Sequence, residues 1–364
     1  MKALLKKGRC AMKIPVFSSF KTKLLLLSLM HFATDGLCAY LVFTRLYPDN
    51  PALSVAVFLG YNTLAFVTQS PVGILIDKYN RPKAMLSVSV LLIILGYLFG
   101  GVCLVAVTFI GMGNSLFHVA GGKYVTSKGG NDISDLGIFV STGAVGLVLG
   151  QRYFHLGALI YVLFGTLLIS LALIIIFDDT EDKEYCEEYN GSTNGRKTAL
   201  LSILGVVFVR SFIGKAVSFD FNAWEHVFLV IALATALGKA LGGICAKRIG
   251  INLTTLVSMS VAAVCLTVGN GHPATFILGI FAFNFSMPIT LYFANILLKG
   301  KEGFAFGTLA AFLAPAYYLA MFVTYSPLIE VFTALLCLAS VVVIYTVSKG
   351  ITNAHKPGNN DDNT

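Results

Sequence analysis

Apolar runs of about 20 residues follow one another from near the start of the chain almost to its end. Each run is long enough to cross the hydrocarbon core of a bilayer as one helix, which keeps its backbone polar groups paired. We therefore predict an all-α membrane protein with twelve transmembrane helices. The predicted segments are 24–46, 53–76, 83–100, 102–122, 134–151, 155–177, 199–220, 226–246, 251–269, 273–297, 303–325 and 327–348.

The composition excludes an ordinary soluble domain. Of the 364 residues, 56% are hydrophobic and 12% are charged, whereas a soluble domain carries about 25% charged residues. The polar–apolar alternation typical of a membrane β-barrel is absent from the sequence. The seven cysteines stand singly along the chain, so the sequence supports neither disulfides nor a metal site.

The positive charges predict the orientation of the chain in the membrane. The net charge is +8, but Lys and Arg are spread over short loops between the apolar segments. This distribution indicates membrane topology and not a nucleic-acid partner. Most of the 26 Lys and Arg residues lie on one side if the N-terminus is inside, so both termini are predicted to be cytoplasmic.

A polar, acidic stretch divides the segments into two groups of six. It contains Asn190 and Gly191, which break helices, and it is predicted to be a cytoplasmic linker at 178–198. The other predicted domains are an N-terminal six-helix bundle at 1–177, a C-terminal six-helix bundle at 199–350 and a disordered tail at 351–364.

The turn after the second segment has an echo after the eighth. Gly73 is followed by Asp77 and Lys78, and Gly242 is followed by Ala246 and Lys247 at the same spacing. The echo replaces the acid with alanine, but together with the six-plus-six arrangement it indicates two pseudo-equivalent halves. Parallel repeats of this kind occur in a large class of secondary transporters.

Asp35 is the one carboxylate well inside a predicted segment. A charge at that depth costs about 2.5–3.5 kcal/mol on insertion scales, so such residues face the protein interior or water and mark functional sites. His31 lies four residues earlier, on the same helical face. The pair can share and pass a proton, which predicts proton coupling through Asp35 and His31. The alternative is a structural hydrogen bond that fixes the first segment to a neighbour.

Other polar residues in the segments are candidate substrate-binding residues. Asn114 and His118 share one face of the fourth segment, where helix packing explains them equally well. Arg210 and Lys239 lie at depth in the seventh and eighth segments, and a buried guanidinium needs an anion or several acceptors. They predict a site for a carboxylate or phosphonate, or else a bridge from Arg210 to Asp35.

Two further candidates lie in the second half. Asn284, with Ser286 and Pro288 after it, predicts a broken helix in the tenth segment, which would expose backbone polar groups to a cavity. Tyr317 in the eleventh segment can line the same cavity.

The turn that begins at Gly73 resembles the loop between the second and third spans of the major facilitator superfamily. The form of that loop is G-x-x-x-D-(R/K)-x-x-R-x-K, and the matching residues are Gly73, Asp77, Lys78, Arg81 and Lys83. The resemblance implies two pseudo-symmetric bundles that rock about a central site. It also implies a cytoplasmic gate made by Gly73, Asp77, Lys78 and Arg81, with Asp77 against the N-terminus of the eleventh span.

The first half resembles the fosmidomycin-resistance branch of that superfamily. The resemblance covers most of residues 25–150. It implies a proton-driven exporter in a bacterial inner membrane. The matching motifs are His31-x-x-x-Asp35, Gln69-x-Pro71-Val-Gly73 and Gly111-x-Gly113-x-x-x-Phe117-His118.

The sequence therefore predicts a proton-coupled secondary active transporter of a small organic molecule, with an anion as cargo and efflux as direction. The alternatives are an importer of an organic anion and a non-transporting sensor or scaffold with a transporter fold. No enzyme motif is present, so neither enzymatic activity nor a cofactor is expected. The expected partners are the substrate, protons and the bilayer, with no nucleic acid, and the expected state is a monomer.

Overall fold

The computed structural model describes residues 19–48, 51–177, 188–217, 226–267, 272–323 and 326–354. All the regular structure within these ranges is helical. The predicted linker residues 178–187 and the tail residues 355–364 lie outside the described part of the chain.

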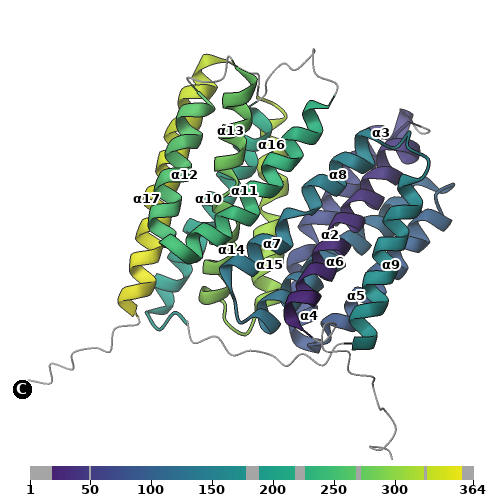
Figure 1. Cartoon of the computed structure of the whole chain (residues 1–364), viewed down its shortest axis with the longest axis horizontal. Helices are drawn as coiled ribbons and strands as arrows, with labels where there is room; N and C mark the ends of the chain where they lie inside the picture. The colour runs from purple at the N-terminus through teal and green to yellow at the C-terminus, as the bar shows by residue number, and fades with distance from the viewer. Residues whose placement is uncertain are drawn as a thin grey trace, which may run out of the picture.

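The helices of the first half run from purple to teal in Figure 1. They are α2 (Phe20–Leu41), the π-helical turn η1 (Val42–Leu46), η2 (Pro51–Leu53), α3 (Ser54–Asn62), the π-helical turn η3 (Thr63–Val67), α4 (Gln69–Tyr79), α5 (Pro82–Leu98), α6 (Cys103–Gly129), α7 (Ile133–Ser141), α8 (Gly143–Arg152) and α9 (Leu159–Phe177).

The helices of the second half run from teal to yellow. They are α10 (Thr193–Ala216), α11 (Val227–Ile249), α12 (Ile251–Cys265), α13 (Pro273–Phe283), α14 (Ser286–Leu297), α15 (Glu302–Ala311), α16 (Leu313–Ala320) and α17 (Pro327–Ala354). The break predicted at Asn284 is confirmed, because α13 ends at Phe283 and α14 begins at Ser286.

The all-helical membrane fold predicted from the sequence is confirmed. Among the described residues, nine helices are long and apolar enough to cross a membrane, when segments joined at a kink are counted as one helix. Two more, α5 and α12, are apolar but shorter, and the second predicted segment is divided among α3, η3 and α4. Twelve complete crossings therefore stay a prediction.

Two predicted boundaries are wrong by a few residues. Helix α10 begins at Thr193, inside the predicted linker, because the side chain of Ser192 accepts a hydrogen bond from the amide of Gly195 and caps the helix. Helix α17 continues to Ala354, past the predicted start of the tail, and its last turn buries Ile351 against the core.

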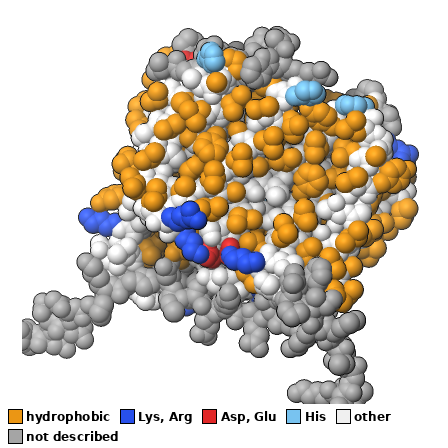
Figure 2. Space-filling view, viewed as in Figure 1, with side chains coloured by type: hydrophobic (Ala, Val, Ile, Leu, Met, Phe, Trp, Pro, Cys, Tyr) orange, Lys and Arg blue, Asp and Glu red, His pale blue; other side chains and the backbone are white. Residues whose placement is uncertain are grey.

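The two halves stand side by side, and the beginning of α2 and the end of α17 lie at the same end of the molecule (Figure 1). We call this end the terminal face. Apolar side chains cover the middle of the view in Figure 2, and most of the visible Lys, Arg, Asp and Glu side chains lie toward the terminal face. This band is the surface expected of a protein that lies across a bilayer.

Burial separates central helices from lipid-facing ones. In the most apolar part of each helix, 72% of the residues of the first span are buried, against 28% in α9 and 22% in α17. The first span, which carries Asp35, is therefore central, and α9 and α17 are peripheral.

The first span can be central because small residues let α8 approach it closely. Gly146 of α8 lies against the carbonyl of Phe32, and Gly150 lies against the carbonyl of Gly36. A Cβ atom at either position would overlap the backbone of α2. Small residues at such crossings allow dispersion contacts between helices, which drive association inside a membrane.

Gly146→Val is expected to lower stability, because its side chain must push α8 away from Phe32, and overpacking costs about 1–3 kcal/mol. The melting temperature in detergent should fall by several degrees. A thiol-reactive dye would report unfolding through exposure of the buried Cys38 and Cys103. The control is Gly165→Val in α9, where the added Cβ meets open space. Equal losses in the two variants would contradict the packing argument.

Candidate functional site

Asp35 lies between two histidines at the centre of the first half. Its Oδ2 is 3.3 Å from Nε2 of His31, one turn earlier on α2, and its Oδ1 is 3.6 Å from Nε2 of His118 on α6. Nδ2 of Asn114 also donates to Oδ1 at 3.0 Å. We call Asp35, His31, His118 and Asn114 the Asp35 cluster.

Both imidazole rings are held by backbone carbonyls. Nδ1 of His31 is 2.8 Å from the carbonyl oxygen of Phe139 on α7, and Nδ1 of His118 is 2.9 Å from the carbonyl oxygen of Asn114. A carbonyl only accepts, so each Nδ1 carries the proton. In a neutral ring, Nε2 then presents its lone pair, and both Nε2 atoms face Asp35.

The cluster is enclosed on most sides but is not sealed. The side chains of His31, His118 and Asp35 are 6%, 13% and 18% exposed. The rings of Phe117 and Phe139 pack around His31, with centroids 5.9 and 5.2 Å from its own. Water can therefore reach the carboxylate more easily than the rings behind it.

Gly143, the first residue of α8, borders the space between Asp35 and His31. A Cβ atom built there would overlap both Oδ2 of Asp35 and Nε2 of His31. Glycine at this position therefore lets the beginning of α8 pack directly against two of the polar atoms of the cluster.

The second half contributes one cation near this cluster and a second cation near the first. Lys239 on α11 interacts electrostatically with Asp35 and with Arg210 on α10. The position of Lys239 is fixed by a close crossing, because a Cβ atom at Gly137 of α7 would be 2.7 Å from the Lys239 carbonyl oxygen.

Neither cation forms an ion pair with an acid among the described residues. Nη1 of Arg210 donates to Oγ1 of Thr290 at 3.3 Å. The bridge from Arg210 to Asp35, one of the two alternatives from the sequence, is not formed in this conformation.

The remaining predicted substrate-binding residues make no hydrogen bond or ring contact with the cluster among the described residues. Nδ2 of Asn284 donates to the carbonyl of Ile280 within its own helix at 2.8 Å. The Tyr317 ring lies 6.4 Å from that of Phe58 on α3, and Nζ of Lys215 is 5.9 Å from its centroid. Contacts among the described residues therefore tie Tyr317 to α3 and α10, not to Asp35.

Asp77, at the end of α4, binds the N-terminus of α15 as predicted. Its carboxylate accepts hydrogen bonds from the amides of Gly303 at 2.9 Å and Phe304 at 2.8 Å. These amides have no partner within the helix, so an acid from the other half acts as their cap. Lys123 of α6 donates to the same carboxylate at 2.9 Å.

The other predicted gate residues have different positions. Gly73 permits the crossing of α4 and α15, since a Cβ atom there would overlap the Gly303 carbonyl. Nζ of Lys78 lies 6.0 Å from the ring of the adjacent Tyr79. Arg81 lines a pocket of about 380 Å³ with Lys83 and Lys128. Neither Lys78 nor Arg81 contributes to the described contacts of Asp77.

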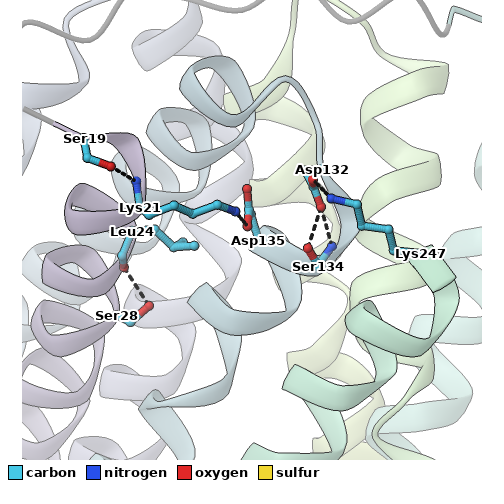
Figure 3. A network of polar contacts seen from close by, with 8 residues as sticks. All are labelled: Ser19, Lys21, Leu24, Ser28, Asp132, Ser134, Asp135 and Lys247. Atoms are coloured by element: carbon cyan, nitrogen blue, oxygen red, sulfur yellow. Dashed lines mark hydrogen bonds and ion pairs between the residues drawn. The ribbon is translucent and has the colours of Figure 1, made fainter.

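A second contact between the halves was not predicted from the sequence. Asp132 caps α7 by accepting from the amide of Ser134 at 2.9 Å, and Nζ of Lys247, at the end of α11, donates to the same carboxylate (Figure 3). Burial alone would raise the pKa of Asp132, but the bonds from Lys247 and Ser134 outweigh it and hold the pKa below its usual value. The carboxylate is therefore ionised at neutral pH.

Asp135, one turn later, connects this contact to the first helix. Nζ of Lys21 donates to Oδ1 of Asp135 at 2.5 Å, and Figure 3 shows Lys21 reaching across from the beginning of α2. The repeated spacing at Gly242 was the one sequence feature that marked the end of α11 as a possible contact. It has Ala246 where the first turn has Asp77, so it did not indicate that an acid of α7 binds there.

No protein-family model and no curated protein sequence matches this chain. Solved structures do. A variant of the Escherichia coli fucose:proton symporter FucP superposes with a TM-score of 0.63 at 13% identity, covering 91% of this chain and 99% of FucP.

Two further structures are described as outward-facing. FucP, described as a major facilitator superfamily transporter in the outward conformation, gives a TM-score of 0.61 at 14% identity over 89% of this chain and 98% of FucP. A bacterial homologue of the iron transporter ferroportin gives 0.56 at 14% identity over 93% and 100%. None of the three is described as a fosmidomycin-resistance protein, so that branch stays a prediction. The chain therefore has the fold of the major facilitator transporters.

Proposed function

We propose that this chain is a proton-coupled secondary active transporter of a small organic anion. The Asp35 cluster exchanges protons, the cations of the second half bind the anion, and the two halves alternate in opening to either side of the membrane. The observation that carries the proposal is the position of Asp35 between Nε2 of His31 and Nε2 of His118.

The proton part follows from the orientation of the rings. With both Nδ1 atoms donating to carbonyls, neutral His31 and His118 present lone pairs to an acceptor-only carboxylate at 3.3 and 3.6 Å. A proton on either Nε2 turns that contact into a charge-assisted hydrogen bond, which is stronger than a neutral one. A proton bound at the cluster can therefore be shared between a ring nitrogen and the carboxylate.

The anion part follows from Arg210 and Lys239. Both side chains are partly buried and have no acidic partner among the described residues, and a cation withdrawn from water needs a counter-charge. Arg210 can bind a carboxylate or phosphonate through two parallel hydrogen bonds. The likeness to a fucose:proton symporter supports cargo–proton coupling on this fold.

The orientation is proposed from charge. Helix α4 ends at the terminal face (Figure 1), so the turn with Lys78, Arg81 and Lys83 lies there, and this face is assigned to the cytoplasm. Asp77 then acts in a cytoplasmic gate. Efflux, a bacterial inner membrane and a monomeric state complete the proposal, and the first two rest on the resemblance of residues 25–150.

Asp35→Asn is expected to abolish proton movement, because an amide cannot carry the exchangeable proton. Proteoliposomes with an internal pH dye would be challenged with a panel of monocarboxylates, dicarboxylates and phosphonates. The anions that move protons in the wild type should give at least a tenfold slower response in the variant, about 1.4 kcal/mol or more in coupling. An unchanged response would remove Asp35 from the coupling mechanism.

Arg210→Gln is expected to weaken anion binding at least about tenfold, since it removes a charged donor pair. The readout is the anion concentration needed to raise the melting temperature of the purified protein. Arg248→Gln is the matched control, because Arg248 is exposed at the end of α11. Equal weakening in both variants would indicate a general charge effect and not a binding site.

Asp77→Asn is expected to open the terminal face. The variant loses charge-assisted bonds to Gly303 and Phe304, worth about 1.5–3 kcal/mol each, and leaves Lys123 without its counter-charge. The open-to-closed ratio should rise at least about tenfold. Spin labels at the exposed positions Tyr79 and Ile249 in a cysteine-free background would report this as longer electron–electron distances.

Lys78→Gln serves as the control for the gate experiment. It removes a charge one residue away that makes no described contact across the interface. The label distances should match those of the parent protein. If Asp77→Asn also leaves them unchanged, the carboxylate does not hold the terminal face shut.

A further inference from the structure

We propose that His31, Asp35 and His118 form a binding site for a divalent transition-metal ion such as Zn²⁺ or Co²⁺. The inference rests on the geometry of the ligand atoms. It stands whether or not the chain couples transport to protons.

The spacing of the ligand atoms fits one small ion. One nitrogen of each histidine and one carboxylate oxygen lie within 4.8 Å of one another. Two ligands that are each about 2.0–2.1 Å from a tetrahedral zinc ion are about 3.3–3.4 Å apart. Nε2 of His31 is 3.3 Å from Oδ2 of Asp35, and Nε2 of His118 is 3.6 Å from Oδ1 of the same carboxylate. A rotation of the carboxylate and small movements of the rings would bring one oxygen and both nitrogens to this spacing.

The contacts behind the ligands are those of a metal site. A ligating histidine nearly always donates its other ring N–H to a carbonyl, carboxylate or water, which fixes the tautomer and the ring. His31 does this with the carbonyl of Phe139, and His118 with that of Asn114. The amide of Asn114 also orients the carboxylate of Asp35. Among the described residues, each histidine therefore has its Nε2 free of a backbone partner and next to the carboxylate of Asp35.

Gly143 keeps a side chain away from the ligand atoms. A Cβ atom there would overlap Oδ2 of Asp35 and Nε2 of His31, so any larger residue would displace both. The partial exposure of Asp35 and His118 leaves further coordination positions to water. Three protein ligands with open positions are typical of reactive or exchangeable sites, whereas structural zinc sites are closed.

The ligand types select among metals. Two imidazoles and one carboxylate suit Zn²⁺, Co²⁺, Ni²⁺, Mn²⁺ and Fe²⁺, whereas Mg²⁺ and Ca²⁺ prefer all-oxygen sites. Lys239 opposes the ion, because it interacts electrostatically with Asp35 and His118, and Arg210 lies near Lys239. Removing the charge of Lys239 should therefore strengthen metal binding.

The test uses full-length, tag-free protein in detergent. Co²⁺ is titrated while its visible absorption is followed, and Zn²⁺ affinity is measured by competition with a chromophoric chelator. We expect one ion per chain, with Co²⁺ bands of a nitrogen–oxygen site. His118→Asn and Asp35→Asn should each weaken binding at least tenfold, and Lys239→Gln should tighten it severalfold.

Three controls make the result decisive. His155→Asn removes an exposed histidine and should change nothing. Gly143→Ala keeps all three ligand residues, but its methyl group must displace Oδ2 of Asp35 and Nε2 of His31, so it should abolish binding. Mg²⁺ should not compete with Zn²⁺. Melting curves identify any variant that is unfolded. If either His118→Asn or Asp35→Asn is unfolded, the result rests on the other.

Three outcomes would overturn the metal site. They are the absence of Co²⁺ and Zn²⁺ binding at millimolar concentration, binding that survives both ligand substitutions, and binding lost in His155→Asn. Proton movement in metal-free proteoliposomes is a separate readout, so failure of the metal site and failure of proton coupling can be told apart.

Discussion

A carboxylate inside the membrane can stay ionised only if donors or cations surround it, and the first half is arranged around that requirement. Asp35 lies on the most buried span, with His31 on its own helix and His118 and Asn114 on α6. The carbonyl of Phe139 on α7 fixes one ring. Three helices must therefore keep their relative positions for the cluster to exist, and the glycines of α8 make this close packing possible.

The two contacts at the terminal face each join the beginning of a helix to the opposite half, but by different chemistry. Helix α15 begins without a cap of its own, and Asp77 supplies one from the other half. Helix α7 is capped by its own Asp132, and the opposite half supplies a cation, Lys247, that binds the same carboxylate. The halves are alike in backbone and unlike in the charge they place at the crossing.

The sequence was sufficient to predict what depends on local pattern. Apolar length predicted the helices, and the pair Asn284 and Pro288 predicted the break between α13 and α14. The resemblance of the Gly73 turn placed Asp77 against α15, and the structure has that contact. The roles of these residues stay predictions.

What the sequence could not supply is which helices meet. His118 was assigned to substrate binding because it shares a face with Asn114, and no periodicity relates either residue to a helix far away in the chain. Helix crossings bring both to Asp35. For the same reason the contact between Asp132 and Lys247 could not be predicted, since Asp132 lies in a turn of one half and Lys247 lies at the end of a helix of the other. The boundary at Thr193 was missed because the helix is capped within a polar stretch.

The division of charge between the halves has a consequence for how they separate. The ionised groups of the Asp35 cluster belong to the first half, and Lys239 and Arg210 belong to the second. Attraction between them strengthens in a low-dielectric interior and weakens as the halves part. A cation taken up at Asp35 cancels this attraction from one side, and an anion bound to Lys239 cancels it from the other. Occupancy of either half thus lowers the work of separation, and the two ligands can influence each other without touching.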